Sequence, residues 1–161
     1  MTTSHRASWH IAHWHWLAWL ETLIKAIAFL FAIPAGLQAL TDGAFAVPGG
    51  ETLVQLVIMA ILTLGLVVAI YDRIIEREII ALVFTVVNVL AHLSMVVTLL
   101  ASQVTAPIIG FCGFMLLGDL VKLVFLATTD FTVRDTPRAV MYGLILMYVG
   151  AYTALLLIAW L

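Results

Sequence analysis

Long apolar runs dominate this sequence, and each matches the length of a helix that crosses a bilayer, about 20 residues for about 30 Å of hydrocarbon. Lipid offers the backbone no hydrogen bonds, so such a segment must satisfy its own peptide groups, as an α-helix does. A membrane barrel would need apolar and polar residues to alternate, and these runs do not alternate. We therefore predict an all-α integral membrane protein, a bundle of five transmembrane helices at residues 14–40, 52–71, 79–101, 107–128 and 139–161.

The composition fits a protein whose solvent is lipid. Hydrophobic residues make up 65% of the chain and charged residues 10%, whereas a soluble domain is about half apolar and about a quarter charged. The connections are too short to hold a second folded unit, so we predict a single transmembrane domain over residues 1–161. The net charge of −2 and the lack of a basic stripe argue against a nucleic-acid partner. The lipid bilayer is the partner that this composition requires.

The basic residues outside the apolar runs predict the orientation. Arg73 and Arg77 lie in the second connection, Arg134 and Arg138 lie in the fourth, and Arg6 precedes the first run. The first and third connections contain no Lys or Arg. Five spans place the three basic segments on one side, which the positive-inside rule assigns to the cytoplasm. We predict a multi-pass protein of a bacterial-type plasma membrane, with the N-terminus in the cytoplasm and the C-terminus outside.

Four acidic or basic residues that are charged at neutral pH lie inside the predicted spans. Glu21 and Lys25 are four residues apart in the first run, and Asp119 and Lys122 are three apart in the fourth, so each couple shares a helix face. A charge near the bilayer centre costs roughly 2.5–3.5 kcal/mol on insertion scales. We therefore expect these side chains to be paired and to face protein or water rather than lipid.

Depth predicts how the four charges pair. The first and fourth helices run in opposite directions, and Glu21 and Lys122 each lie eight residues, about 12 Å, inside the inner boundary. Glu21 is then level with Lys122, and Lys25 is level with Asp119, so we predict that these helices are neighbours joined by both cross-helix pairs. Two alternatives remain. Each couple could close within its own helix while the lysines reach towards the headgroups, or the four residues could form a working site for protons, an ion or a charged ligand.

The third run carries a polar face formed by Asn88 and His92, four residues apart. These side chains could form hydrogen bonds between helices, and so could Tyr142, Tyr148 and Tyr152 of the fifth run. His92 could instead ligate a haem or a pigment. Because the remaining histidines all lie at the inner surface, no second histidine lies at its depth, which favours a packing or hydrogen-bonding role.

The histidines before the first run form a second cluster. His10 and His13 share a face if this segment is helical, and imidazoles so placed could bind a divalent metal ion. The alternative is an interfacial segment in which histidine and tryptophan meet the headgroups. The sequence contains no acidic residue near these histidines before Glu21, so the metal hypothesis rests on the imidazoles alone.

The sequence contains no nucleophile–base pair, phosphate-binding loop or catalytic pair of carboxylates, and it requires no cofactor. These observations favour a non-enzymatic subunit, scaffold or self-associating bundle, as a homo-oligomer or in a larger membrane complex, with a charge clamp between the first and fourth helices. A small oligomeric transporter or channel that uses the internal charges is the alternative, and a haem- or pigment-binding protein that uses His92 is a further one. A water-filled cavity that touches Lys25 and Asp119, with the charges only half paired, would favour transport, and a dry, fully paired site would favour the scaffold.

Overall fold

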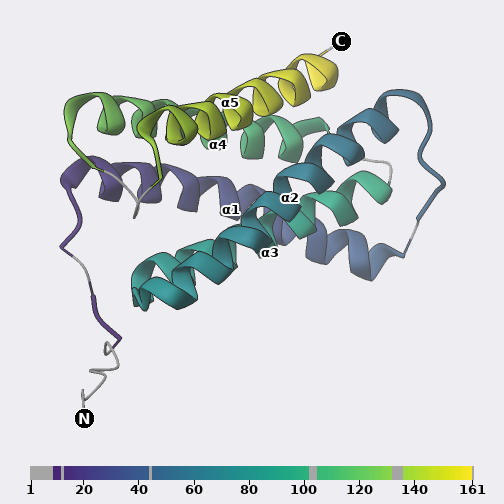
Figure 1. Ribbon diagram of the computed structural model, residues 1–161. Coiled ribbons are helices and arrows are strands. Elements are labelled where there is room, and N and C mark those ends of the chain that lie inside the picture. Colours follow the sequence, from purple (N-terminus) through teal and green to yellow (C-terminus); the bar gives the residue numbers. More distant parts are fainter. Residues whose placement is uncertain (1–8, 12, 44, 102–104, 132–135, 161) are drawn as a thin grey trace.

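The computed structural model describes residues 9–11, 13–43, 45–101, 105–131 and 136–160 (Figure 1). Its helices are α1 (Trp16–Asp42), α2 (Gly50–Glu76), α3 (Ile79–Leu100), α4 (Thr105–Thr128) and α5 (Arg138–Trp160). All five are long and apolar enough to cross a membrane. The all-helical bundle predicted from the apolar runs is therefore present.

Successive helices run in opposite directions, which gives the bundle two ends (Figure 1). At one end of the bundle lie the first residues of α1 and the α2–α3 connection, and we call this end the N-terminal face. At the opposite end lie the first residues of α2 and the last residues of α5, and we call it the C-terminal face. The main packing partners are α1 with α4 and α3, α2 with α3, and α4 with α5. The contact between α2 and α5 is much less extensive.

The charged segment between the second and third predicted spans is mostly part of α2. α2 continues to Glu76, five residues beyond the predicted end at residue 71, and an Arg73–Glu76 ion pair of 2.5 Å lies in its last turn. Arg77 then turns the chain with a left-handed φ of 55°. Glu78 caps α3 by accepting hydrogen bonds from the amides of Ile80 and Ala81. The charged sequence that marks a connection is therefore largely helical, because its side chains pair along the helix.

The N-terminal segment is tied to the same junction. The His10 amide donates to the Arg77 carbonyl at 3.0 Å, and the Ile79 amide donates to the His10 carbonyl at 3.1 Å. From there the chain runs to His15, whose Nδ1 accepts from the Leu17 amide and caps α1. The segment therefore passes across the N-terminal face from α3 to α1 (Figure 1).

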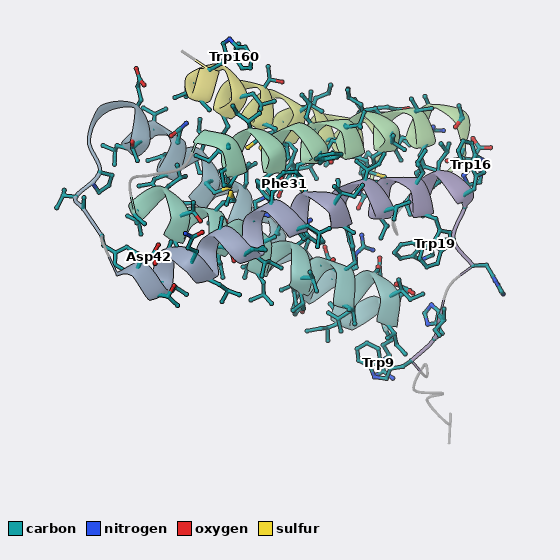
Figure 2. All side chains as sticks on the ribbon, turned by 180° about the vertical axis from the view of Figure 1, so that it is seen from behind. Trp9, Trp16, Trp19, Phe31, Asp42 and Trp160 are labelled. Atoms are coloured by element: carbon teal, nitrogen blue, oxygen red, sulfur yellow. The ribbon has the colours of Figure 1, made fainter. Side chains whose placement is uncertain are left out.

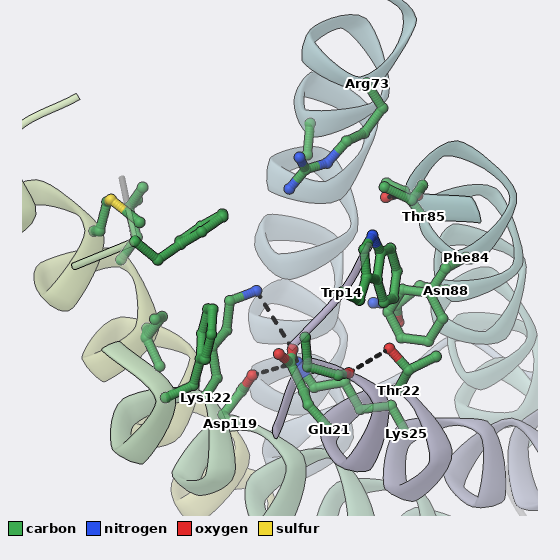
Figure 3. Close-up of a pocket in the computed structure, with 18 of the residues that line it drawn as sticks. Trp14, Glu21, Thr22, Lys25, Arg73, Phe84, Thr85, Asn88, Asp119 and Lys122 are labelled. Carbon is green, nitrogen blue, oxygen red and sulfur yellow. Dashed lines mark hydrogen bonds and ion pairs between the residues drawn. The ribbon is translucent and has the colours of Figure 1, made fainter. Parts of the chain in front are cut away.

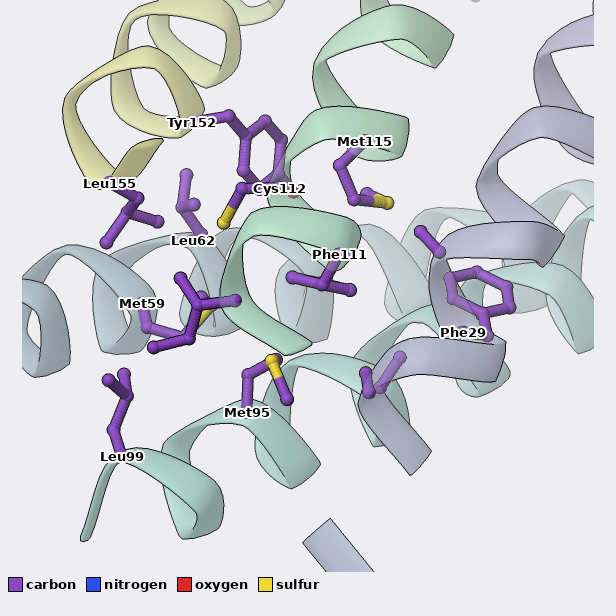
Figure 4. Close-up of a cluster of buried hydrophobic side chains, with 14 residues drawn as sticks. Phe29, Met59, Leu62, Met95, Leu99, Phe111, Cys112, Met115, Tyr152 and Leu155 are labelled. Carbon is purple, nitrogen blue, oxygen red and sulfur yellow. The ribbon is translucent and has the colours of Figure 1, made fainter. Parts of the chain in front are cut away.

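The main core lies towards the C-terminal face, where helices converge around Phe111 and Cys112 of α4 (Figure 4). Met59, Met95 and Tyr152 come from three other helices and are also fully buried. The outer surface is apolar as well, since side chains such as Leu30 and Leu64 are 72% and 65% exposed. Trp16, Trp19 and Trp160 are also exposed (Figure 2). A fold that buries polar residues and exposes leucines around its circumference is suited to lipid.

Candidate functional site

A cavity of about 870 Å³ runs into the bundle from the N-terminal face. His10, Arg73 and Phe131 line it at that face, and Asn88 and Tyr152 line it in the middle of the bundle. All five helices contribute to its walls. The main core then separates this cavity from the C-terminal face.

The cavity touches the four internal charges that the sequence singles out (Figure 3). Lys25 Nζ lies 2.5 Å from Asp119 Oδ1, and Lys122 Nζ lies 3.3 Å from Glu21 Oε1. Both cross-helix pairs predicted from depth are therefore present. Their levels match because Lys25 is nine residues from the first residue of α1 and Asp119 is nine residues from the last residue of α4. That places both about 14 Å from the N-terminal face along their helices.

The four charged residues form one continuous network rather than two separate ion pairs. Lys25 Nζ lies 2.7 Å from Glu21 Oε1, so one ammonium serves a carboxylate on its own helix and another on α4. Glu21 in turn lies between two lysines. The within-helix alternative is therefore present on α1 together with the cross-helix pairs. Lys25, Glu21 and Asp119 are buried, whereas the Lys122 side chain is 35% exposed.

Gly118 allows α1 and α4 to approach at this point. A Cβ built at this position would lie 2.7 Å from Lys25 Cγ and 2.8 Å from Lys25 Cε. The lysine stem therefore lies directly against the α4 backbone, which carries its ammonium to Asp119 one residue further along. In the sequence, this glycine carries no signal beyond general close packing.

Two residues that line the cavity each have a buried side-chain oxygen that accepts no hydrogen bond from the part of the chain that the structure describes. These oxygens are Asp119 Oδ2 and Asn88 Oδ1, and each belongs to a residue that is 4% exposed. A buried acceptor without a donor costs about 1–3 kcal/mol, and more when it is charged. The cluster is thus paired on one side of Asp119 and has free acceptor capacity on the other.

His92 is held by hydrogen bonds at both ring nitrogens. Its Nδ1 lies 2.8 Å from the Asn88 carbonyl oxygen, and its Nε2 lies 2.7 Å from Tyr152 Oη. The ring also meets Phe111 edge-on, with centroids 5.0 Å apart. Asn88 and Tyr152 line the cavity, but His92 lies behind them. These contacts are those of a hydrogen-bonding core residue, and a haem or pigment would have to replace one of them to reach a ring nitrogen.

His10 and His13 both line the mouth of the cavity, beside Trp14 and His15. The residues that the structure describes include no group of three or more His, Cys, Asp or Glu side chains placed to hold a metal ion. Metal binding by His10 and His13 therefore stays a hypothesis without support from the geometry. What the structure adds is their position at the opening rather than on a helix face.

Sequence reasoning missed the walls of the cavity. Small residues such as Ala18, Gly65 and Ala69 face it, and aromatic side chains, Phe84 and Phe125 among them, border it. Neither group forms a recognisable motif, because alanine, glycine and phenylalanine are common throughout the apolar runs. The Tyr148 hydroxyl, which donates to the Leu62 carbonyl at 3.2 Å, links α5 to α2 beside Gly65. Beyond this contact, towards the N-terminal face, Ala69 and Leu144 of these two helices line the cavity.

The chain matches no protein-family model, no curated protein and no solved structure. Its chemistry therefore has to be inferred from the site itself. That site combines buried charges in the middle of an apolar bundle, acceptors without donors among the described residues, and a cavity that connects them to one face. Such an arrangement can hold water or a small molecule next to charge, in a position that lipid alone would make costly.

Proposed function

We propose that this protein is a small membrane transporter that binds a solute in the cavity and moves it across the bilayer. The observation that carries the proposal is the cavity itself, which reaches Lys25 and Asp119 in the middle of the bundle. Charged side chains at such a depth are typical of solute and ion pathways. Membrane transporters also hold their substrates near the bilayer midplane, between helices.

The proposed orientation makes this an inward-facing state. Arg73, Arg77 and Arg138 lie at the N-terminal face, while Arg6 and Arg134, which the orientation also used, lie outside the described residues. The positive-inside rule assigns that face to the cytoplasm. On this proposal the cavity opens to the cytoplasm, and the core around Phe111 and Cys112 closes the path to the outside.

Release on the opposite side requires the two ends to open in turn. The cytoplasmic mouth would close and the core near the C-terminal face would part, as in other alternating-access transporters. The limited contact between α2 and α5 makes α2 the element best suited to move. Its remaining strong contact is with α3, which also packs on α1, so a rocking of α2 and α3 about the α1–α3 interface is the simplest motion that opens either end.

The scaffold remains the second candidate, and one observation favours it. The internal charges are equal in number and form three ion pairs among the described residues, which is what a structural clamp needs. A clamp alone, however, requires neither a cavity at the charges nor an unpaired carboxylate oxygen. A homo-oligomer is compatible with either function.

Cysteine labelling tests whether the cavity is open to water from the cytoplasm. In a Cys112→Ala background, Ala69→Cys places a thiol on the cavity wall, and Val68→Cys places one at the same depth on the exposed outer surface of α2. A thiol in water ionises and reacts with a charged methanethiosulfonate, whereas a thiol in lipid does not. We expect the reagent to label the Ala69→Cys variant in inside-out vesicles and to leave the Val68→Cys variant unmodified.

Two results would count against the proposal. If the Ala69→Cys and Val68→Cys variants are equally protected, the cavity is dry and the scaffold is favoured. If the Ala69→Cys variant is labelled only when the reagent is added to right-side-out vesicles, the orientation is wrong and the cavity faces outwards.

A further inference from the structure

The buried charged residues that line the cavity indicate which charge a bound solute should carry. Lys25 is shared by two carboxylates, so the buried trio of Glu21, Lys25 and Asp119 carries a formal charge of −1. The balancing charge is Lys122, which is partly exposed and contacts the far carboxylate, Glu21. At Asp119 itself the negative charge is therefore less completely neutralised.

The hydrogen-bond acceptors at the cavity also favour a ligand that carries donors and a positive charge. Asp119 Oδ2 is a carboxylate oxygen, which can only accept while it is ionised, and it receives no donor from the described residues. The Asn88 amide, also on the cavity wall, has a buried oxygen that likewise receives no donor from them. A ligand that fits these groups must bring N–H or O–H donors, and a positive charge would strengthen its bond to Asp119.

An anion finds no equivalent site among the cations that line the described part of the cavity. The Arg73 guanidinium lies 2.5 Å from Glu76, and Lys25 and Lys122 both contact Glu21. Each of these cations is already neutralised by a carboxylate, so an anionic ligand would have to compete with that carboxylate for the positive charge.

The other residues that line the cavity are mostly apolar, so they favour a ligand that has an apolar group. Leu66, Leu144 and Met147 line the cavity, and so do the aromatic residues Phe84 and Trp14. Aromatic faces attract organic ammonium ions through cation–π contacts, which are stronger where water is excluded. The volume of about 870 Å³ lies within the range of pockets that hold drug-sized molecules, about 300–1,000 Å³, so a bare inorganic cation would leave most of it unused.

We infer that the cavity binds an amphipathic organic cation, a protonated amine whose ammonium group donates to Asp119 and Asn88 while its apolar part lies against the aromatic wall. This inference rests on the proposed function, because it takes the cavity to be a solute site. It adds the substrate class, and it assigns Asp119 as the residue that recognises the positive charge.

Three probes of matched size test the inference on the unmodified protein. Phenethylamine is a cation, 2-phenylethanol is neutral and 3-phenylpropionate is an anion at pH 7. Binding is measured by isothermal titration calorimetry to the full chain in lipid nanodiscs, and empty nanodiscs correct for partitioning into lipid. We expect phenethylamine to bind about tenfold more tightly than 2-phenylethanol, as a charge-assisted hydrogen bond requires, and 3-phenylpropionate to bind most weakly.

A variant then assigns the effect to one carboxylate. Asp119→Asn should reduce the affinity for phenethylamine about tenfold and leave that for 2-phenylethanol nearly unchanged. Asp130→Asn is the matched control, because Asp130 is an exposed acid near the end of α4 that does not line the cavity. If Asp119→Asn does not fold, the comparison of the three probes on the unmodified protein decides the inference.

The outcomes separate the inference from the function on which it rests. Equal affinity for the amine and the alcohol, or a preference for the anion, overturns the organic-cation inference and leaves a solute cavity in place. If none of the probes binds although the Ala69→Cys variant is labelled from the cytoplasm, the inference also fails while the proposed function stands. If none binds and the thiol of the Ala69→Cys variant is protected, both fail.

Discussion

Replacing Lys25 with methionine is expected to lower the free energy of unfolding by about 3–5 kcal/mol, as breaking a buried ion pair does in other proteins. The variant removes the donor to Asp119 Oδ1, and it leaves a buried carboxylate with neither oxygen paired to a described residue. Glu21 keeps one ion-pair partner in this variant, because Lys122 still contacts it at 3.3 Å. Unfolding in detergent by titration with SDS measures the change.

The control for Lys25→Met is Lys122→Met, which removes the same charge from the partly exposed lysine. It should cost less than about 1 kcal/mol, in the range of exposed pairs, since Glu21 keeps its contact with Lys25. The double variant Lys25→Met with Asp119→Leu should recover much of the loss, because it removes both buried partners together. Losses that simply add in the double variant would contradict the ion-pair account.

Replacing Tyr152 with alanine is expected to lower the free energy of unfolding by about 4 kcal/mol, near the middle of the range for large core side chains. The ring is fully buried and meets Phe111 edge-on, and its hydroxyl hydrogen-bonds to His92 Nε2. The variant therefore leaves both a void in the main core and a ring nitrogen that has lost its partner. The same SDS titration measures the loss.

Tyr152→Phe separates the hydrogen bond from the packing. It keeps the ring but removes the hydroxyl, and should cost about 1–3 kcal/mol because buried His92 loses a partner. Tyr71→Phe, at an exposed tyrosine on α2, serves as the control and should have almost no effect. If Tyr152→Phe is as harmless as Tyr71→Phe, His92 does not depend on this hydrogen bond.

The helices, and the ion pairs between α1 and α4, could be predicted because both depend only on the position of a residue along its helix. Lipid thickness fixes the helix length, and a rise of about 1.5 Å per residue converts position into depth. Once α1 and α4 run in opposite directions, Glu21 and Lys25 can meet only Lys122 and Asp119 at equal depth. The charged residues that follow the second predicted span continue α2 to Glu76, and Arg73 pairs with Glu76 along the helix.

The cavity could not be predicted, because it depends on how helices are spaced rather than on what each contains. The free oxygen of Asp119 follows from the position of Lys25, which Gly118 permits, and no pattern in the sequence distinguishes that glycine from Gly113. Tyr152 could be named from the sequence as a possible hydrogen-bonding residue, but its pairing with His92, sixty residues earlier in the chain, could not be predicted. Sequence reasoning could nominate the charges, but the contacts that favour transport over a scaffold are tertiary.

The central claim, that this bundle opens in turn to both sides of the membrane, can be measured on the native cysteine. Cys112 is fully buried in the main core, seven residues from Asp119 towards the C-terminal face. It therefore lies between the cavity and the face proposed to be outside. A charged, membrane-impermeant methanethiosulfonate reaches it from that side only if the core parts.

The measurement is the rate at which this reagent, added outside right-side-out vesicles, labels Cys112 in the otherwise unmodified protein. Protein denatured in SDS defines complete labelling, and the Cys112→Ala variant defines the background. The transporter account predicts slow but complete modification from outside, because each excursion to the outward-open state exposes the thiol. Full protection of Cys112 from the outside, in vesicles whose denatured protein labels completely, would contradict it.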